Sequence, residues 1–108
     1  MKQFFIILFA LLLSVTGFAQ NTAIDSLKTV ISKQADDSTK VRSLLELSKQ
    51  YYDSDPTEAI RLAQEANALG HRIGYLKGAA YGLKNVGIAY YYQGNYIEAI
   101  SVWKQSFA

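Results

Sequence analysis

The sequence predicts an all-α fold in which antiparallel helical hairpins stack on one another. Two observations lead to this prediction. Downstream of residue 23, apolar residues recur at intervals of three and four, which is the period of an amphipathic helix. A pattern of residue types also occurs twice, with Ala59 and Ala99 lying 40 residues apart and Leu47 and Val86 lying 39 apart. Repetition at such a period is typical of stacked helical hairpins.

The first segment, residues 1–19, has the features of a secretory signal. Lys2 supplies a positive charge, a nearly unbroken apolar run extends from Phe4 to Val15, and small residues favour cleavage before Gln20. The run is about twelve residues long, whereas a membrane-spanning helix needs roughly 20. We therefore expect the chain to be exported to the periplasmic or extracellular side of the inner membrane.

The composition of the remaining 89 residues argues against several classes of function. Ten Lys and Arg stand against nine Asp and Glu, so the net charge is near +1 and favours neither nucleic acid nor a membrane as the partner. The chain has no cysteine, which excludes disulfide bonds, thiol catalysis and a lipid-modified N-terminal cysteine. Stability must therefore come from packing alone.

A leading amphipathic helix is expected within residues 20–35. Its apolar positions share one face, and they are Ile24, Leu27, Val30 and Ile31. The pattern ends at residues 36–38, whose side chains can accept hydrogen bonds from the exposed amides of the next helix. That second helix is predicted over residues 39–52. Its apolar stripe is wide enough to contact two neighbours and consists of Val41, Leu44, Leu45, Leu47 and Tyr51.

The third helix has the clearest start in the chain. Asp55 supplies an N-cap carboxylate, Pro56 suits the first helical position, and Glu58 lies in the first turn. Small residues at helical spacing from Ala59 onward allow a neighbouring helix to approach closely. We expect the helix to end at Gly70, which suits a left-handed C-cap.

The fourth helix, over residues 75–92, contains three glycines in its interior. Gly78, Gly82 and Gly87 each cost up to about 1 kcal/mol relative to alanine. We interpret them as points of close contact, where the backbone of another helix or a large aromatic ring occupies the space of the missing side chain.

The last helix is predicted from Tyr96 onward, after a turn at Gly94. Its apolar face carries Ile100, Trp103 and Phe107, and no later segment is present to cover it. We therefore expect a truncated array of hairpins, and self-association through these three side chains.

These positions resemble the tetratricopeptide repeat (TPR) family, in its forty-residue variety, over residues 36–108. The resemblance depends most on Gly87, Tyr90, Ala99 and Trp103, which match the typed positions of that family at fixed offsets. It implies a short right-handed solenoid of stacked hairpins.

The resemblance divides the chain into two repeats. The first, residues 36–74, is a degenerate copy, because Ser48 stands where the family has glycine and Ala63 replaces the second aromatic. The second, residues 75–108, is nearly complete, and the array is apparently truncated after it. Terminal repeats are often atypical in this way.

The resemblance also implies a groove, lined mainly by the first helix of each repeat, that holds an extended peptide or a partner helix. By position, the groove-facing residues are Arg42, Leu45, Lys49, Tyr52, Tyr81, Lys84, Ile88 and Tyr91. This set is basic and aromatic, with no carboxylate, and it favours an acidic or C-terminal peptide. The family's clamp for a terminal carboxylate is incomplete here, since Asn85 occupies one clamp position but Ile88 stands where asparagine is expected. The alternative is that the lysines merely solvate a helix surface.

The residues predict no catalytic, cofactor-binding or metal site. His71 is the one imidazole, and its place near a helix C-terminus is explained by the helix dipole. Asp53, Asp55 and Glu58 lack the glycine and the alternating ligands of a calcium loop. Base stacking on the tyrosines is a further alternative, which export and the near-neutral charge disfavour.

Two functions remain open from the sequence. The first is a non-enzymatic scaffold that binds a protein or peptide. The second is the N-terminal sensory segment of a larger signalling protein, such as a sensor histidine kinase, a nucleotide cyclase or a DNA-binding regulator, whose effector domain lies beyond residue 108.

Overall fold

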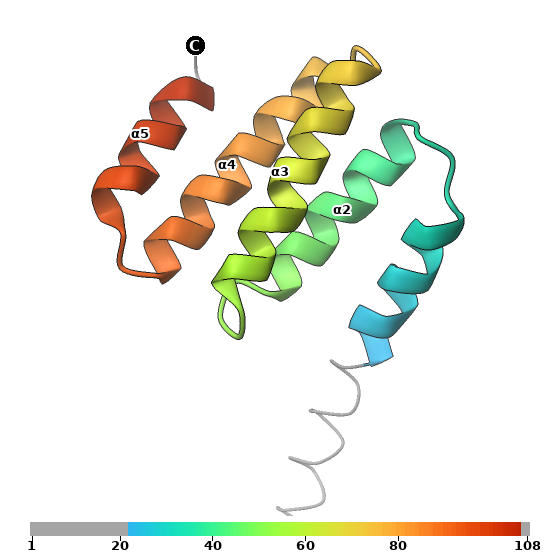
Figure 1. Cartoon of the computed structure of the whole chain (residues 1–108), viewed down its shortest axis with the longest axis horizontal. Coiled ribbons are helices and arrows are strands. Elements are labelled where there is room, and N and C mark those ends of the chain that lie inside the picture. The colour runs from blue at the N-terminus through green and yellow to red at the C-terminus, as the bar shows by residue number, and fades with distance from the viewer. Residues whose placement is uncertain (1–21, 107–108) are drawn as a thin grey trace, which may run out of the picture.

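The computed structural model describes residues 22–106, which form five helices and no strand (Figure 1). The first helix covers residues 22–33, and it is followed by α2 (Ser38–Gln50), α3 (Pro56–Arg72), α4 (Leu76–Tyr92) and α5 (Tyr96–Ser106). The predicted all-α class is confirmed. The expected secretory signal, residues 1–19, lies outside the described residues. Within the described part, no helix combines the length and apolar character that crossing a membrane requires.

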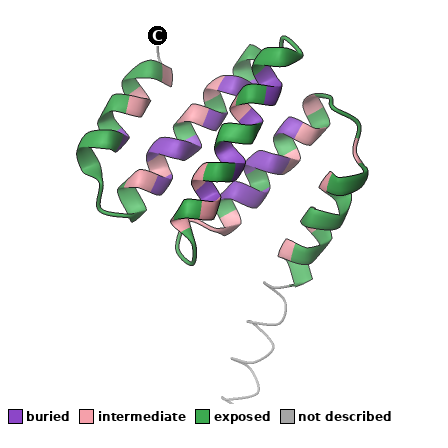
Figure 2. Ribbon diagram, in the orientation of Figure 1, coloured by how far each residue is buried: buried purple, intermediate pink, exposed green. Residues whose placement is uncertain are grey.

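Helices α2 to α5 lie side by side, and consecutive helices run in opposite directions (Figure 1). α3 packs against both α2 and α4, α5 packs against α4, and α2 also contacts α4. Burial is concentrated in α2, α3 and α4 (Figure 2). The apolar centre of the core consists of large side chains from α2 and α3, among them Val41, Leu44, Leu47, Leu62 and Leu69.

The helix over residues 22–33 packs on this core through most of its predicted apolar face. Ile24, Leu27 and Ile31 are partly buried against the core. Val30 was expected on the same face but is 47% exposed. It lies about 60° of helix rotation beyond Leu27, at the edge of the apolar stripe, and therefore points away from the core.

The predicted N-cap at Asp55 is confirmed, and among residues 36–38, which were expected to cap the second helix, Asp37 is the N-cap. Asp37 Oδ1 accepts hydrogen bonds from the backbone amides of Thr39 and Lys40, at 3.0 and 3.1 Å. Asp55 Oδ1 accepts one from the Glu58 amide at 3.2 Å, and Pro56 occupies the first position of α3. Each carboxylate satisfies amides that have no partner within the helix.

The predicted end of the third helix at Gly70 is wrong. α3 continues to Arg72, Gly70 is buried inside it, and the residue with positive φ in the following turn is Gly74, at 77°. Gly70 has a packing role instead, because a Cβ at this position would lie 2.7 Å from the backbone nitrogen of Ala79 in α4. A glycine that ends a helix and one that admits a neighbour look alike in sequence.

The glycines of α4 are points of close contact, as interpreted. A Cβ at Gly82 would lie 2.7 Å from the backbone carbonyl oxygen of Ala63 and 2.8 Å from the backbone nitrogen of Asn67, both in α3. At Gly87 the Trp103 indole of α5 occupies the space that a side chain would fill. The first is an approach between helix backbones, and the second is an aromatic ring packed on a helix backbone.

Every pair of helices in contact among α2 to α5 also shares a hydrogen bond from a side chain to a backbone carbonyl. These bonds are Ser48 Oγ to Ala59 at 2.8 Å, Asn67 Nδ2 to Ala79 at 2.7 Å, Asn85 Nδ2 to Leu45 at 3.3 Å and Trp103 Nε1 to Lys84 at 3.2 Å. Ser48, which departs from the repeat pattern, therefore bonds the next helix. Such bonds satisfy polar groups that would otherwise be buried unpaired.

Asp36 links the segment before α2 to the end of α3. Its carboxylate accepts hydrogen bonds from Lys40 Nζ and from an Arg72 guanidinium nitrogen, each at 3.0 Å. Lys40 first and Arg72 second hold the pKa of Asp36 below its ordinary value. Because the group is exposed to solvent, the contribution of these ion pairs to stability is small.

We expect Gly82→Ala to lower the free energy of unfolding by about 1–3 kcal/mol, the usual cost of overpacking, although alanine is the better helix former. The control is Ala68→Gly at an exposed position of α3, which should cost only the helix-propensity difference of about 1 kcal/mol. Urea denaturation measures both. A more stable Gly82→Ala variant would contradict the close approach of α3 and α4.

We expect Asp36→Asn to lower the free energy of unfolding slightly at about pH 7 and by less at about pH 2. The pKa of Asp36 is lower in the folded chain than in the unfolded chain. Its contribution is therefore present above the unfolded value of about 4 and is lost as the pH falls through the folded pKa. Urea titrations at both pH values measure the effect, and an equal loss at both would contradict the ion pairs.

Candidate functional site

The candidate site lies between α2 and α4, which present matching faces. Asn85 in α4 donates a hydrogen bond from Nδ2 to the carbonyl oxygen of Leu45 in α2, at 3.3 Å. Toward the C-terminal ends of the same helices, the rings of Tyr52 and Tyr92 stack with their centroids 5.6 Å apart. The partners in each pair are 40 residues apart, one more than the 39 residues that separate the matching repeat positions Leu47 and Val86 of the same two helices.

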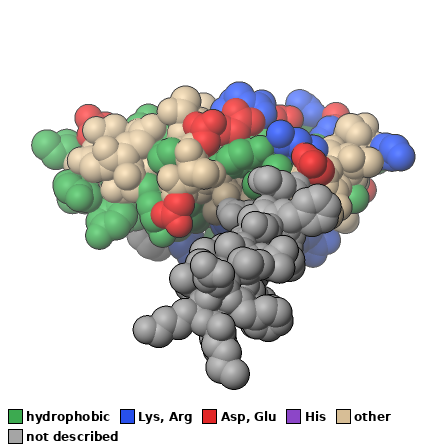
Figure 3. Space-filling view, turned by 90° about the horizontal axis from the view of Figure 1, so that it is seen from below, with side chains coloured by type: hydrophobic (Ala, Val, Ile, Leu, Met, Phe, Trp, Pro, Cys, Tyr) green, Lys and Arg blue, Asp and Glu red, His purple; other side chains and the backbone are tan. Residues whose placement is uncertain are grey.

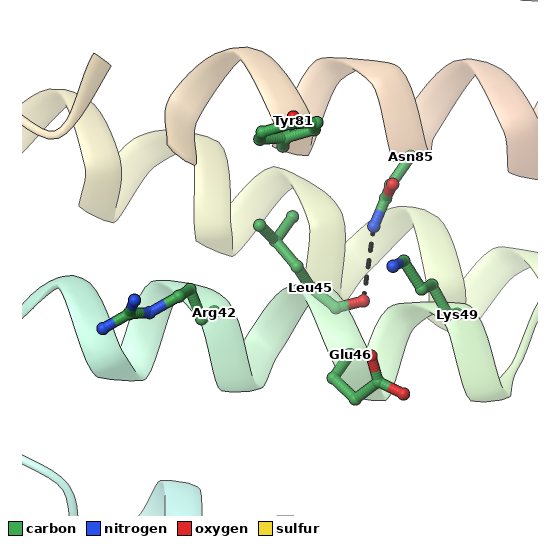
Figure 4. Close-up of a pocket in the computed structure, with 6 residues that line it drawn as sticks. All are labelled: Arg42, Leu45, Glu46, Lys49, Tyr81 and Asn85. Carbon is green, nitrogen blue, oxygen red and sulfur yellow. Dashed lines mark hydrogen bonds between the residues drawn. The ribbon is translucent and has the colours of Figure 1, made fainter. Parts of the chain in front are cut away.

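A cleft of about 360 Å³, hereafter the basic cleft, opens beside the contact between Leu45 and Asn85 (Figure 4). Its lining comes from both helices: Arg42, Leu45, Glu46, Lys49, Tyr81 and Asn85. Leu45 and Asn85 are buried and form the floor, whereas the other four side chains are exposed and form the rim. Four predicted groove residues thus meet here, namely Arg42, Leu45, Lys49 and Tyr81.

The basic cleft carries an excess of positive charge. No ion pair joins Arg42 or Lys49 to a carboxylate in the part of the chain that the structure describes. Arg42 makes one long contact, at 3.5 Å, to the Thr39 hydroxyl. Glu46 also lies on the rim, so the expectation of a lining without carboxylates is wrong. Its Oε1 accepts a hydrogen bond from Gln50 Nε2 at 3.3 Å.

Lys84 lies beside the basic cleft rather than in it. Its Nζ is 5.4 Å from the centroid of the Tyr81 ring, and both residues line a smaller cleft of about 160 Å³ between α4 and α5. Lys77, Ala80 and Ser106 complete this second cleft. Lys77 was not among the predicted residues, although it precedes Tyr81 by four residues and Lys84 by seven, which places all three on one side of the helix.

The remaining predicted residues lie farther along the groove. Ile88 is half-buried in α4, one to two turns beyond Tyr81 and Asn85. Tyr52 and Tyr91 belong to a group of four aromatic residues that we call the tyrosine pad, formed by Tyr52, Tyr91, Tyr92 and Tyr96. The predicted residues therefore divide between a basic end and an aromatic end of the same surface.

His71, Asp55 and Glu58 each have a structural role near the end of a helix. His71 is exposed in the last turn of α3, near the helix C-terminus as expected. Asp55 caps α3, and Glu58 pairs with Arg61, with 2.6 Å between the closest atoms. Within residues 22–106, no group of three His, Cys, Asp or Glu side chains is placed to hold a metal ion.

Ile100 and Trp103, two of the residues expected to mediate self-association, have different environments in the structure. Ile100 is 51% exposed, and the neighbouring Ile97 is 82% exposed. Trp103 instead packs on Gly87 and is bonded to α4, so its indole belongs to an internal contact. Phe107 lies outside the described residues. The exposed large apolar side chains of α5 are thus Tyr96 and the two isoleucines rather than the tryptophan.

Comparison of the chain with protein-family models, with curated proteins and with solved structures gave no match.

We expect Tyr52→Phe to leave the free energy of unfolding unchanged or to raise it by up to about 1 kcal/mol. The Tyr52 hydroxyl is buried, and no partner is found for it among the described residues. Burial, with a smaller effect of Tyr92, raises its pKa. Phenylalanine removes the cost of burying an unpaired hydroxyl and keeps the ring stack.

The matched control for this substitution is Tyr96→Phe, on a ring that is 57% exposed. It should change stability by less than about 0.5 kcal/mol, as most surface substitutions do. A loss of more than about 1 kcal/mol for Tyr52→Phe alone, measured by urea denaturation, would show that the hydroxyl is hydrogen-bonded in solution.

Proposed function

We propose that this chain is an exported, non-enzymatic scaffold that binds an acidic peptide in the basic cleft between α2 and α4. The observation on which the proposal rests is the pair of cations, Arg42 and Lys49, on the rim of a cleft with a buried apolar and amide floor. No carboxylate of the described chain pairs with either cation. A partner that supplies negative charge would therefore find complementary charge already in place.

The proposal includes a tetratricopeptide-like arrangement, in which the hairpins α2–α3 and α4–α5 stack as a short right-handed solenoid. The hydrogen bond from Asn85 to Leu45 and the stack of Tyr92 on Tyr52 support the side-by-side stacking of the first helices of the two hairpins. The packing of Trp103 on Gly87 supports the pairing inside the second hairpin, since the repeat pattern expects an aromatic residue in the gap left by a small one.

The floor and rim of the basic cleft offer groups that suit a peptide. The Arg42 guanidinium can donate two parallel hydrogen bonds to a carboxylate, and Lys49 adds a point charge. Asn85 uses Nδ2 on the Leu45 carbonyl, which leaves its Oδ1 as an acceptor for a peptide amide. Tyr81 supplies apolar area with little loss of rotamer entropy. Glu46 repels a second anion on its side of the rim.

We expect Lys49→Glu to weaken the binding of an acidic peptide about tenfold or more, because a charged hydrogen bond contributes about 1.5–3 kcal/mol. The probe is a fluorescein-labelled peptide with three consecutive Asp or Glu residues, chosen from a peptide array and titrated by anisotropy. The substitution should also flatten the salt dependence of the affinity, because fewer opposite charges then meet.

The matched control is Lys33→Glu, on an exposed side chain of the helix over residues 22–33. It makes the same change in net charge at a residue that does not line the basic cleft, so the affinity should fall by less than about twofold. Equal losses for the two variants, or no loss for either, would move the peptide site away from Lys49.

A further inference from the structure

The surface that holds the basic cleft continues along α2 and α4 to the tyrosine pad. We propose that it recognises two features of one peptide, an acidic residue in the basic cleft and an aromatic residue on the pad, about five residues apart. This inference rests on the proposed peptide-binding function. It adds a second binding site and a spacing to that function.

Helical periodicity places the basic cleft and the pad on one continuous surface. In α4, intervals of four, three and four residues separate Tyr81, Asn85, Ile88 and Tyr92. In α2, intervals of three and four separate Arg42, Leu45 and Lys49, and Tyr52 follows in the turn just after the helix ends at Gln50. Such intervals keep side chains on one helix face. The hydrogen bond from Asn85 to Leu45 and the stack of Tyr92 on Tyr52 join the two faces at two levels.

The tyrosine pad presents aromatic surface to solvent. Tyr91, Tyr92 and Tyr96 are 55%, 50% and 57% exposed. Tyr91 meets Tyr92 and Tyr96 edge to face, with centroids 6.3 and 5.3 Å apart. Hydrophobic side chains gather at the end of the molecule where α4 and α5 lie (Figure 3). Rings in such offset and edge-to-face contacts have free faces and edges on which one more aromatic ring can pack.

Charge decides which end of the surface takes which residue. The two rim cations, Arg42 and Lys49, belong to the basic cleft. The contacts between a cation and a ring in the described chain are Lys28 with Tyr51 and Lys84 with Tyr81, and neither involves the pad. An acidic side chain therefore gains attraction at the basic cleft, whereas an uncharged ring gains contact at the pad.

The length of the surface sets the spacing of the two residues in the peptide. Tyr81 and Tyr92 are eleven residues apart in α4, which corresponds to about 16 Å at 1.5 Å per residue. An extended peptide advances about 3.3 Å per residue, so about five residues span the distance. For an acidic residue bound at the end of the basic cleft that holds Arg42 and Tyr81, a shorter spacing would leave the pad empty.

The test is a set of three labelled peptides titrated against the purified chain by fluorescence anisotropy. One carries an acidic pair followed five residues later by tryptophan, the second has serine in place of the tryptophan, and the third has the tryptophan two residues after the acidic pair. We expect the first peptide to bind about threefold to tenfold more tightly than the other two, as one added aromatic contact would produce.

Variants of the chain then locate the aromatic site. Tyr92→Ala should remove the advantage of the first peptide and leave the affinity for the serine peptide unchanged. Tyr91→Ala tests the same site without disturbing the stack on Tyr52, and circular dichroism checks that both variants keep their helices. The control is Leu76→Ala, on a side chain that is 64% exposed at the other end of α4, which should preserve the advantage.

The outcomes separate the two proposals. Equal affinities for the first and third peptides, or an advantage that survives both tyrosine substitutions, would overturn recognition by the pad while leaving the acidic site intact. Binding of all three peptides that is insensitive to Lys49→Glu would instead overturn the proposed function.

Discussion

Close approach between helix backbones is the constraint on which the rest of the structure depends. At Gly82 the backbones of α4 and α3 are so near that an added methyl group would lie 2.7 Å from the Ala63 carbonyl oxygen. The interface between α3 and α4 has few large side chains to bury. Close van der Waals contact and hydrogen bonds between the helices must therefore contribute more to its stability. The side chains that bond a neighbouring helix donate to backbone carbonyl oxygens. Each of these oxygens can accept two hydrogen bonds, one from its own helix and one from the neighbouring helix.

The functional surface follows from this packing. α3 contacts both α2 and α4, which brings those two helices together in the same direction, with Asn85 against Leu45 and Tyr92 against Tyr52. A slip of one helical turn between them would separate Asn85 from Leu45 and Tyr92 from Tyr52. The basic cleft and the tyrosine pad therefore depend on the same contacts as the core, and the proposed peptide site needs no movement to form.

Features set by neighbouring residues could be predicted from the sequence, whereas features set by another helix could be predicted only in part, as at Gly82 and Gly87. The carboxylate caps at Asp37 and Asp55 obey rules that act within four residues, and both were found. Gly70 was assigned to a helix end because its real constraint, the backbone of Ala79, is invisible in the local pattern. Groove residues were predicted by their positions along each helix. The cleft that Lys84 lines is formed together with α5, and the pattern within α4 does not show that.

The most direct test of this account is a nuclear Overhauser measurement on the side-chain amide protons of Asn85 in the isotopically labelled chain. The register of α2 and α4 requires strong cross-peaks from these protons to the backbone of Leu45, since Nδ2 lies 3.3 Å from its carbonyl oxygen. Cross-peaks to residues one turn away in α2, or rapid exchange with water and no contact to α2, would contradict the packing from which the basic cleft and its function are derived.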